Sequence, residues 1–290
     1  MQQPAVKQSA STDAATKHEL MIKGANITVY EQGQGAPLLF LHGSPDNHAM
    51  WLPLIEHLSR SLNARFIAPD LPGFGNSTLP ANFPLTLDNE ADFIRALLGA
   101  LNVTEPVTLV VTDFGGHYGS AFAVKYPDLV RGMVISNTNF FREYDWHSFA
   151  KLYRVPLLGE LLIATPKAML DRSLKQFAPA LPQWYIDESF APGFGSPRVR
   201  KAILRYYRER NAQDFAGWDD KLLALLQTKP ALVLWGDKDP FIAPTFGDRW
   251  GKAQVKHFSN NSHWLALEAT TDYGDAILQW LESLQVGVRR

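Results

Sequence analysis

The sequence predicts an α/β protein with a mostly parallel, doubly wound sheet and an inserted group of helices. Short apolar runs alternate with helical patterns along most of the chain, and several of these runs are apolar at consecutive positions. Strands buried on both faces of a parallel sheet show such continuous runs. The alternation stops between residues 139 and 227, which indicates an excursion from the sheet.

The expected strands are runs rich in Val, Ile, Leu and Phe, at 27–30, 37–41, 64–69, 107–111, 132–136, 230–235 and 255–258. Patterns with a helical period lie between them. These expected helices cover residues 48–62, 88–101, 115–126 and 271–285. Strands and helices in this order are typical of a doubly wound sheet.

The helical excursion defines the expected domains. Residues 1–16 are small and polar, lack an apolar run and are expected to form a disordered tail. Residues 17–138 and 228–290 form the core domain, and residues 139–227 form a helical cap, or lid, in which prolines separate short helices. The helical windows of the cap are 146–154, 157–163, 166–176, 182–188 and 198–212.

The composition argues against several classes of partner and cofactor. With a formal net charge of −1, no overall field favours nucleic acid or an anionic membrane. The chain has no cysteine, which excludes thiolate metal sites, and its eight histidines show no ligand cluster. We therefore expect no metal, no organic cofactor, no contact with nucleic acid or membrane, a cytoplasmic location and a monomer or homodimer.

A sharp turn from strand to helix contains Asp113, in the segment VVTDFGGHYGS at residues 110–120. Small residues after it, Gly115, Gly116 and Gly119, allow the helix to pack close to the strand. Two roles fit the aspartate. It could cap the helix that begins at Phe114, a role that aspartate fills well, or it could be a nucleophile.

Two further segments supply partners for a nucleophile. The segment WGDKDPFIAP puts Asp237 and Asp239 in the loop after a buried strand, and NNSHWLALEA puts His263 before the final helix. A histidine oriented by a carboxylate can activate water. All of these positions follow the carboxyl ends of strands, where open α/β sheets build their sites.

The segment HGSPDNHAMW, residues 42–51, leaves another strand. A His-Gly pair there gives a tight turn that can present backbone N–H groups to a developing anion. The N–H groups of Ser44 and Phe114 are the expected donors. The alternative is a plain turn without a chemical role.

Together, these segments resemble the α/β-hydrolase superfamily from about residue 20 to residue 285, and within it the aspartate-nucleophile branch of epoxide hydrolases and haloalkane dehalogenases. The resemblance implies that Asp113 attacks carbon, that His263 is the base and that Asp239, placed by the G-x-x-D-P pattern, orients it. Asp237 is the alternative orienting acid. A carboxylate suits attack on sp³ carbon, because the resulting ester can be opened by water.

The two branches differ in what stabilises the leaving group. Dehalogenases of the family usually carry a tryptophan after the nucleophile and a second Trp or an Asn, whereas this chain has Phe114 and Ser44. Epoxide hydrolases use cap tyrosines as acids. The segment LRYYRERN resembles the part of their cap that carries the second tyrosine, which corresponds to Tyr207. Candidates for the first acid are Tyr153, Tyr144 and His147.

The resemblance therefore predicts an epoxide hydrolase that converts a small apolar epoxide and water to a diol. A haloalkane dehalogenase is the alternative, and a non-catalytic ligand-binding member of the fold is the second. The expected substrate pocket includes His42, Trp146 and Trp264. Aromatic residues of the cap are expected to make it apolar, namely Phe140, Phe141, Phe149, Phe177, Trp184, Phe190 and Phe194.

Overall fold

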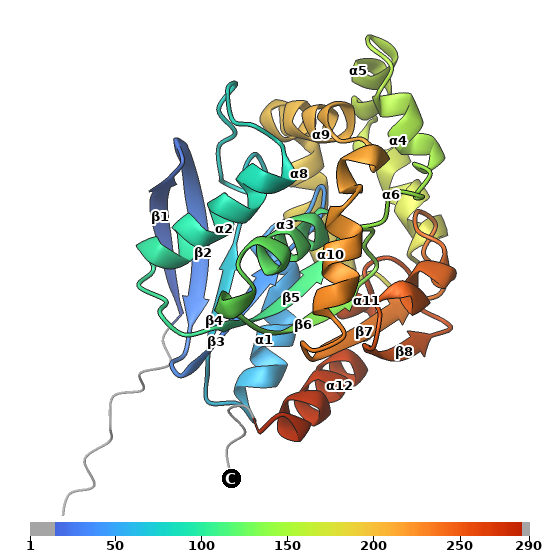
Figure 1. The fold of residues 1–290 in the computed structure, drawn as a ribbon. Helices are drawn as coiled ribbons and strands as arrows, with labels where there is room; N and C mark the ends of the chain where they lie inside the picture. The colour runs from blue at the N-terminus through green and yellow to red at the C-terminus, as the bar shows by residue number, and fades with distance from the viewer. Residues whose placement is uncertain (1–14, 286–290) are drawn as a thin grey trace, which may run out of the picture.

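One eight-stranded sheet organises the protein, with strand order β1-β2-β4-β3-β5-β6-β7-β8 (Figure 1). A computed structural model describes residues 15–285. The strands β3 to β8 are parallel, whereas β1 and β2 are antiparallel and extend one edge. The strands are β1 (Thr16–Ile22), β2 (Ala25–Gln32), β3 (Ala36–Leu41), β4 (Ala64–Pro69), β5 (Val107–Thr112), β6 (Val130–Ser136), β7 (Ala231–Gly236) and β8 (Gln254–Phe258).

The predicted fold class is confirmed by this sheet. All residues of β5 and of β7 are buried, as continuous apolar runs indicate. The edge strand β1 is not predicted, because its exposed and half-buried residues give no apolar run. The predicted tail reaches residue 16, but Thr16 already belongs to β1, where it pairs with Glu31 of β2. Residues 1–14 of that tail lie outside the described residues.

Helices cover both faces of the sheet. On one face α1 packs against α12, and on the other α2 and α10 both pack against α3 (Figure 1). The expected helix at 48–62 begins as a 3₁₀ turn, and α1 starts next to Pro53, which is favoured in a first turn. The core elements are η1 (His48–Trp51), α1 (Leu52–Ser59), α2 (Leu87–Ala100), α3 (Asp113–Lys125), η2 (Pro127–Leu129), η5 (Pro244–Arg249), α11 (Leu265–Glu268) and α12 (Thr270–Ser283).

The segment between β6 and β7 is helical. Its helices α4 to α9 gather beyond one end of the sheet, whereas α10 returns to the sheet beside α3 (Figure 1). The expected cap of residues 139–227 thus includes one helix that covers the sheet. The elements are α4 (Ser148–Tyr153), α5 (Leu158–Ile163), α6 (Lys167–Phe177), α7 (Gln183–Tyr185), η3 (Ile186–Phe190), α8 (Ala191–Gly195), α9 (Pro197–Glu209), η4 (Ala212–Phe215) and α10 (Trp218–Leu225).

Across residues 15–285, no helix is both long enough and apolar enough to cross a bilayer.

The packing of α3 on the sheet depends on small residues. A Cβ atom added at Gly115 would lie 2.1 Å from the carbonyl oxygen of Leu41, and one at Gly116 would lie 2.0 Å from Thr138 Oγ1. Both distances are well inside van der Waals contact, so the helix can approach only with glycine at these positions.

Replacing Gly115 with Ala should lower the free energy of unfolding by about 3 kcal/mol, because the new methyl group would clash with backbone atoms of β3. Gly99 in α2 is the matched control, since a Cβ there meets nothing within 4 Å. Gly99→Ala should raise the free energy of unfolding by about 0.5–1 kcal/mol. Urea unfolding of the two variants measures both changes, and equal stabilities would contradict the packing argument.

Candidate active site

Asp113 lies at the turn between β5 and α3 with a backbone φ of 46°. This left-handed conformation is uncommon for a residue with a side chain and costs roughly 1–3 kcal/mol. The loop after β6 holds the turn in place. Thr138 Oγ1 donates to the carbonyl of Asp113 at 2.6 Å, and the N–H of Asp113 donates to the carbonyl of Asn137 at 3.1 Å.

The loop after β3 lies directly against the Asp113 side chain. A Cβ atom on Gly43 would lie 2.4 Å from Cβ of Asp113, so glycine permits this close approach. The N–H of Ser44 donates to Asp113 Oδ1 at 2.7 Å, and the N–H of Phe114 also donates to the carboxylate. The two donors predicted from the sequence thus both contact Asp113, where they favour negative charge on its oxygens.

The imidazole of His263 lies between two carboxylates. Its Nδ1 is 2.7 Å from Asp239 Oδ2, and its Nε2 is 3.5 Å from Asp113 Oδ2. Asp239 is held by the backbone, because its Oδ1 accepts from the N–H groups of Phe241 at 2.7 Å and Ile242 at 3.1 Å. The structure therefore brings the predicted nucleophile, base and acid together.

Asp237, the alternative acid, lies outside this arrangement. Its Oδ1 is 2.5 Å from Nδ1 of His257, a partly exposed histidine on β8. The loop after β7 turns so that only Asp239 reaches His263. The geometry thus agrees with the preference that the G-x-x-D-P pattern gives.

Asn137 is a member of the site that no motif marks. Its Nδ2 donates to Asp239 Oδ2 at 2.8 Å and to the carbonyl of Gly236 at 3.1 Å, and its Oδ1 accepts from the N–H of Gly236 at 3.0 Å. The side chain therefore fixes the acid and the end of β7 together. The available signal was its place directly after β6, at the carboxyl end of a buried strand.

The charges of the site shift the pKa values of its members. Burial alone would lower the pKa of His263, but the carboxylates of Asp239 and Asp113 outweigh burial and raise it well above its usual value. Burial alone would raise the pKa of Asp113, but hydrogen bonds and charge from His263 and the two backbone N–H groups lower it. Asp113 is therefore ionised and His263 protonated before substrate binds.

A cavity of about 150 Å³ lies over Asp113 and His263 and is mostly apolar. Of the expected aromatic residues, Phe140 and Phe141 pack elsewhere, against Phe215 and Trp250, and Trp184 does not reach the cavity. The cap residues that do line it are His147, Phe149, Tyr153, Thr165, Leu170, Ser173, Leu174, Phe177, Phe190, Phe194, Ile203 and Tyr207.

Tyr207 lines this cavity beside Asp113, and its hydroxyl faces His147. The Nδ1 atom of His147 accepts a hydrogen bond from the N–H of Ala150 at 3.2 Å, so the ring proton is on Nε2. This Nε2–H lies 3.5 Å from the hydroxyl oxygen of Tyr207 and can donate to it. The hydroxyl proton of Tyr207 can then point into the cavity and be donated to a bound molecule.

The other cap candidates differ in what their hydroxyl groups contact. The hydroxyl of Tyr144 donates to the carbonyl of Phe241 at 3.1 Å, so its proton is already engaged. Tyr153 lines the cavity, and its ring centroid lies 5.8 Å from that of Tyr207. The site therefore offers Tyr207 as an acid, His147 as its neighbour and Tyr153 further along the cavity wall.

His42, predicted to line the pocket, does not reach it. Its side chain is buried, with Nδ1 2.6 Å from the carbonyl of Gly43 and Nε2 accepting from the N–H of Leu71 at 2.8 Å. Burial lowers the pKa of His42 to about 4, so the ring is neutral and both nitrogens are satisfied. His42 is a structural residue that shapes the loop carrying Ser44.

The two predicted tryptophans lie near the site in different roles. Trp264 lines the cavity with its ring, but its N–H donates to the buried carboxylate of Asp46, at 3.2 Å from Oδ1. Trp146 stacks near Phe114 and borders a small adjoining cavity of about 20 Å³ that also touches Asp113. Within residues 15–285, the indole N–H of Trp146 has no hydrogen-bond partner.

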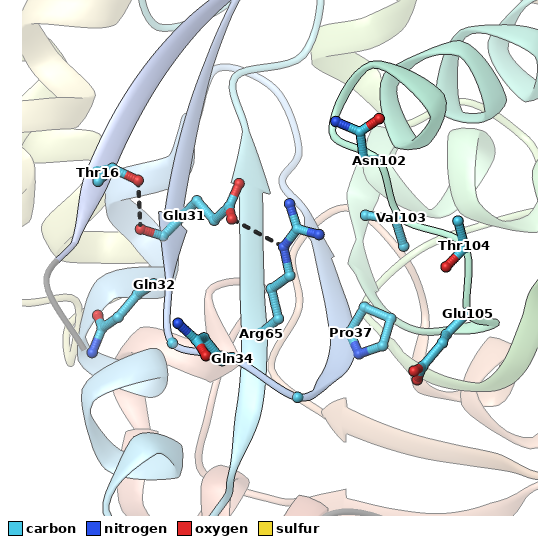
Figure 2. A pocket seen from close by; sticks show the side chains of 12 residues that line it. Thr16, Glu31, Gln32, Gln34, Pro37, Arg65, Asn102, Val103, Thr104 and Glu105 are labelled. Carbon is cyan, nitrogen blue, oxygen red and sulfur yellow. Dashed lines mark hydrogen bonds and ion pairs between the residues drawn. The ribbon is translucent and has the colours of Figure 1, made fainter. Parts of the chain in front are cut away.

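A larger cavity of about 500 Å³ lies at the other end of the strands, near the starts of β3 and β4 (Figure 2). This cavity is polar. The positive charge of Arg65 in its wall is neutralised by Glu31, to which Arg65 Nε donates at 2.9 Å. Arg65 also donates to the carbonyl of Leu101 at 2.8 Å. At this cavity Thr16 Oγ1 lies 3.1 Å from His18 Nε2, but this pair is exposed, whereas His263 and Asp239 beside Asp113 are buried. The smaller cavity over Asp113 is therefore the candidate site.

Known proteins resemble this chain over most of its length. A "cis-3-alkyl-4-alkyloxetan-2-one decarboxylase" of Shewanella oneidensis is 30% identical over 88% of this chain and 85% of its own length. A haloalkane dehalogenase of Mesorhizobium japonicum is 27% identical over 92% of both chains.

The fold is shared with solved structures as well. The structure of the epoxide hydrolase CorEH superimposes with a TM-score of 0.78, at 20% identity, over 93% of this chain and all of that one. The family model described as "alpha/beta hydrolase fold" matches residues 36–270. With the elbow, the histidine and the acid in place, these matches show that the chain belongs to the α/β-hydrolase fold family, on the side of the aspartate-nucleophile enzymes.

Proposed function

We propose that this enzyme hydrolyses small apolar epoxides through a covalent ester on Asp113. The observation that carries the proposal is the hydroxyl of Tyr207, which shares the cavity with Asp113 and whose oxygen faces the Nε2–H of His147. An opening epoxide needs a proton for its alkoxide, and a tyrosine hydroxyl can supply one. The apolar wall of the cavity suits the carbon skeleton of such a substrate.

In the first step, an oxygen of Asp113 attacks one ring carbon and the C–O bond of the epoxide breaks. The electron pair of that bond goes to the ring oxygen, which takes the proton of Tyr207. The N–H of His147 supports the tyrosinate that forms, since His147 Nε2 is 3.5 Å away. The products of the step are an ester on Asp113, an alcohol on the neighbouring carbon and a deprotonated Tyr207.

In the second step, His263 takes a proton from water, which attacks the carbonyl carbon of the ester. The N–H groups of Ser44 and Phe114 stabilise the negative charge on the oxygen of the tetrahedral intermediate. Collapse of the intermediate breaks the bond between the carbonyl carbon and the alkyl oxygen. That oxygen takes the second proton of the attacking water, so a diol leaves and the carboxylate of Asp113 is restored. To take a proton from water, His263 must first release the proton on Nε2, and loss of the Asp113 charge in the ester lowers the pKa of His263. That proton goes through solvent to the tyrosinate of Tyr207, so both residues end the cycle in their starting states.

Haloalkane dehalogenation is the second candidate, because the relative from Mesorhizobium japonicum carries that name and the N–H of Trp146 lies unpartnered beside Asp113. Three features favour the epoxide. Phe114 has no ring N–H, Ser44 replaces the usual asparagine, and the N–H of Trp264 is bound to Asp46. A purely ligand-binding role gives no reason for the hydrogen-bonded set of Asp113, His263 and Asp239.

Replacing His263 with Gln should trap the ester, because the first step uses Asp113 and Tyr207 while the second needs the base. The protein should gain the mass of the substrate in intact-protein mass spectrometry. The panel should hold epoxides, haloalkanes and an oxetan-2-one, the ring named in the Shewanella oneidensis relative. Diol release by the native enzyme supports the epoxide, and halide release the second candidate. The variant Asp113→Asn is the control, and an adduct on it would place the nucleophile elsewhere.

Replacing Tyr207 with Phe should slow ester formation from an epoxide by about 100-fold or more, because the alkoxide would leave unprotonated. Rapid-quench measurement of ester formation and of ester hydrolysis separates the two steps, and hydrolysis should change little. His147→Phe should slow the same step by a smaller factor, since it acts through Tyr207. Equal rates in Tyr207→Phe and native enzyme would remove this residue from the mechanism.

Replacing Asp113 with Asn should lower the pKa of His263. The charge and the hydrogen bond of Asp113 both raise that pKa in the native protein, and a neutral amide, like the ester, supplies no such charge. NMR titration of the imidazole measures the change. Asp239→Asn, which removes the other carboxylate, should also lower it. An unchanged pKa in Asp113→Asn would show that the charge of Asp113 does not control the protonation of the base.

A further inference from the structure

The outer side of the cap exposes an unusual number of apolar side chains. Ten large apolar residues are exposed within residues 15–285, and eight of them lie between residues 149 and 184. Leu157 and Leu161 are the most exposed of these, at 84% and 72%. Contiguous apolar exposure of this kind marks an interaction site. We define the apolar cap surface as Phe149, Leu152, Val155, Leu157, Leu158, Leu161 and Met169.

This surface lies on α4, α5 and the start of α6, which form the outer edge of the molecule away from the sheet (Figure 1). The helices α4 and α6 are adjacent, because the rings of Phe149 and Phe177 meet edge to face with centroids 6.1 Å apart. The surface is therefore carried by neighbouring helices and is not scattered over the protein.

The cavity over Asp113 opens at the same place. Phe149 lines the cavity and is also 43% exposed, so it stands at the mouth. Other lining residues of α4 and α6, such as Tyr153 and Phe177, are half-buried, whereas Phe190 and Phe194 behind them are buried. A molecule bound to the apolar cap surface would therefore lie at the entrance of the active site.

The charge around the surface is positive. Residues 148–177 contain five lysines or arginines and two aspartates or glutamates, and Lys151 and Lys167 also pair with Asp145 and Asp187 outside this range. Arg172 and Lys175 on α6 are exposed, and neither belongs to an ion pair in the part of the chain that the structure describes. Apolar side chains flanked by cations are the combination that binds a bilayer with anionic headgroups.

We propose that the apolar cap surface docks the protein on an anionic lipid bilayer, so that the mouth of the cavity faces the apolar phase. A second copy of the chain fits less well, since a two-fold contact would place the same positive excess on both sides. The expectation of no membrane contact came from the net charge of the whole chain, which averages out this local excess. The proposal does not depend on the proposed reaction.

Co-sedimentation of the full chain with vesicles tests the proposal. The native protein should bind vesicles of phosphatidylcholine with phosphatidylserine more tightly than vesicles of phosphatidylcholine alone, and added salt should weaken the binding. The double variant Leu157→Glu with Leu161→Glu should bind at least about tenfold more weakly, because two inserted side chains are lost. Circular dichroism and thermal unfolding check that its fold is intact.

Met21→Glu is the matched control, because Met21 is 70% exposed on β1, far along the chain from the cap. It should bind vesicles like the native protein. A second double variant, Arg172→Glu with Lys175→Glu, should lose the preference for phosphatidylserine and keep the weaker binding. Native protein that stays in the supernatant with both vesicles would overturn the proposal. So would a dimer in analytical ultracentrifugation that Leu157→Glu with Leu161→Glu dissociates without any vesicle binding.

Discussion

The site depends on the close contact between the Asp113 carboxylate and the loop after β3. The parallel register pairs Leu41 of β3 with Val111 of β5, so both chains leave the sheet side by side. Gly43 allows the backbone to touch the side chain, and the Ser44 N–H then binds Asp113 Oδ1 at 2.7 Å. The strain of a φ of 46° is offset by such bonds, which exist only where the sheet brings the loops together.

The electrostatics of Asp113, His263 and Asp239 follow from the same arrangement. Two carboxylates on either side of His263 keep it protonated while Asp113 is free, and the protonated histidine stabilises the ionised carboxylate of Asp113 in return. In the proposed reaction, ester formation removes one of the two charges. The remaining carboxylate, Asp239, is fixed by Asn137 and by two backbone N–H groups, so the histidine keeps its orientation when its charge changes.

The sequence predicted those parts of the fold and the site that local patterns record. Buried strands appear as apolar runs, and Asp113, Asp239 and His263 each follow such a run. The roles of Asn137, Asp46 and His42 depend on contacts between distant segments. Asp46, for example, accepts hydrogen bonds from Tyr185, 139 residues along the chain, and from Trp264, 218 residues along. No sequence pattern around residue 46 indicates these partners. Likewise, no pattern indicates that the backbone N–H of Leu71 donates a hydrogen bond to Nε2 of His42.

The short cap helix α4 has apolar side chains on two opposite sides. α4 and α5 have six residues each, too few to be stable alone, so packing must hold them. Arg154 supplies part of this by donating to the carbonyls of Tyr207 and Arg210 at the end of α9. On α4, Ala150 is buried and Tyr153 faces the cavity, while Leu152 is exposed. A helix with one apolar side needs only a core, whereas α4 presents apolar groups on opposite sides. The inner side faces the active-site cavity, and the outer side belongs to the surface that we propose to contact a bilayer.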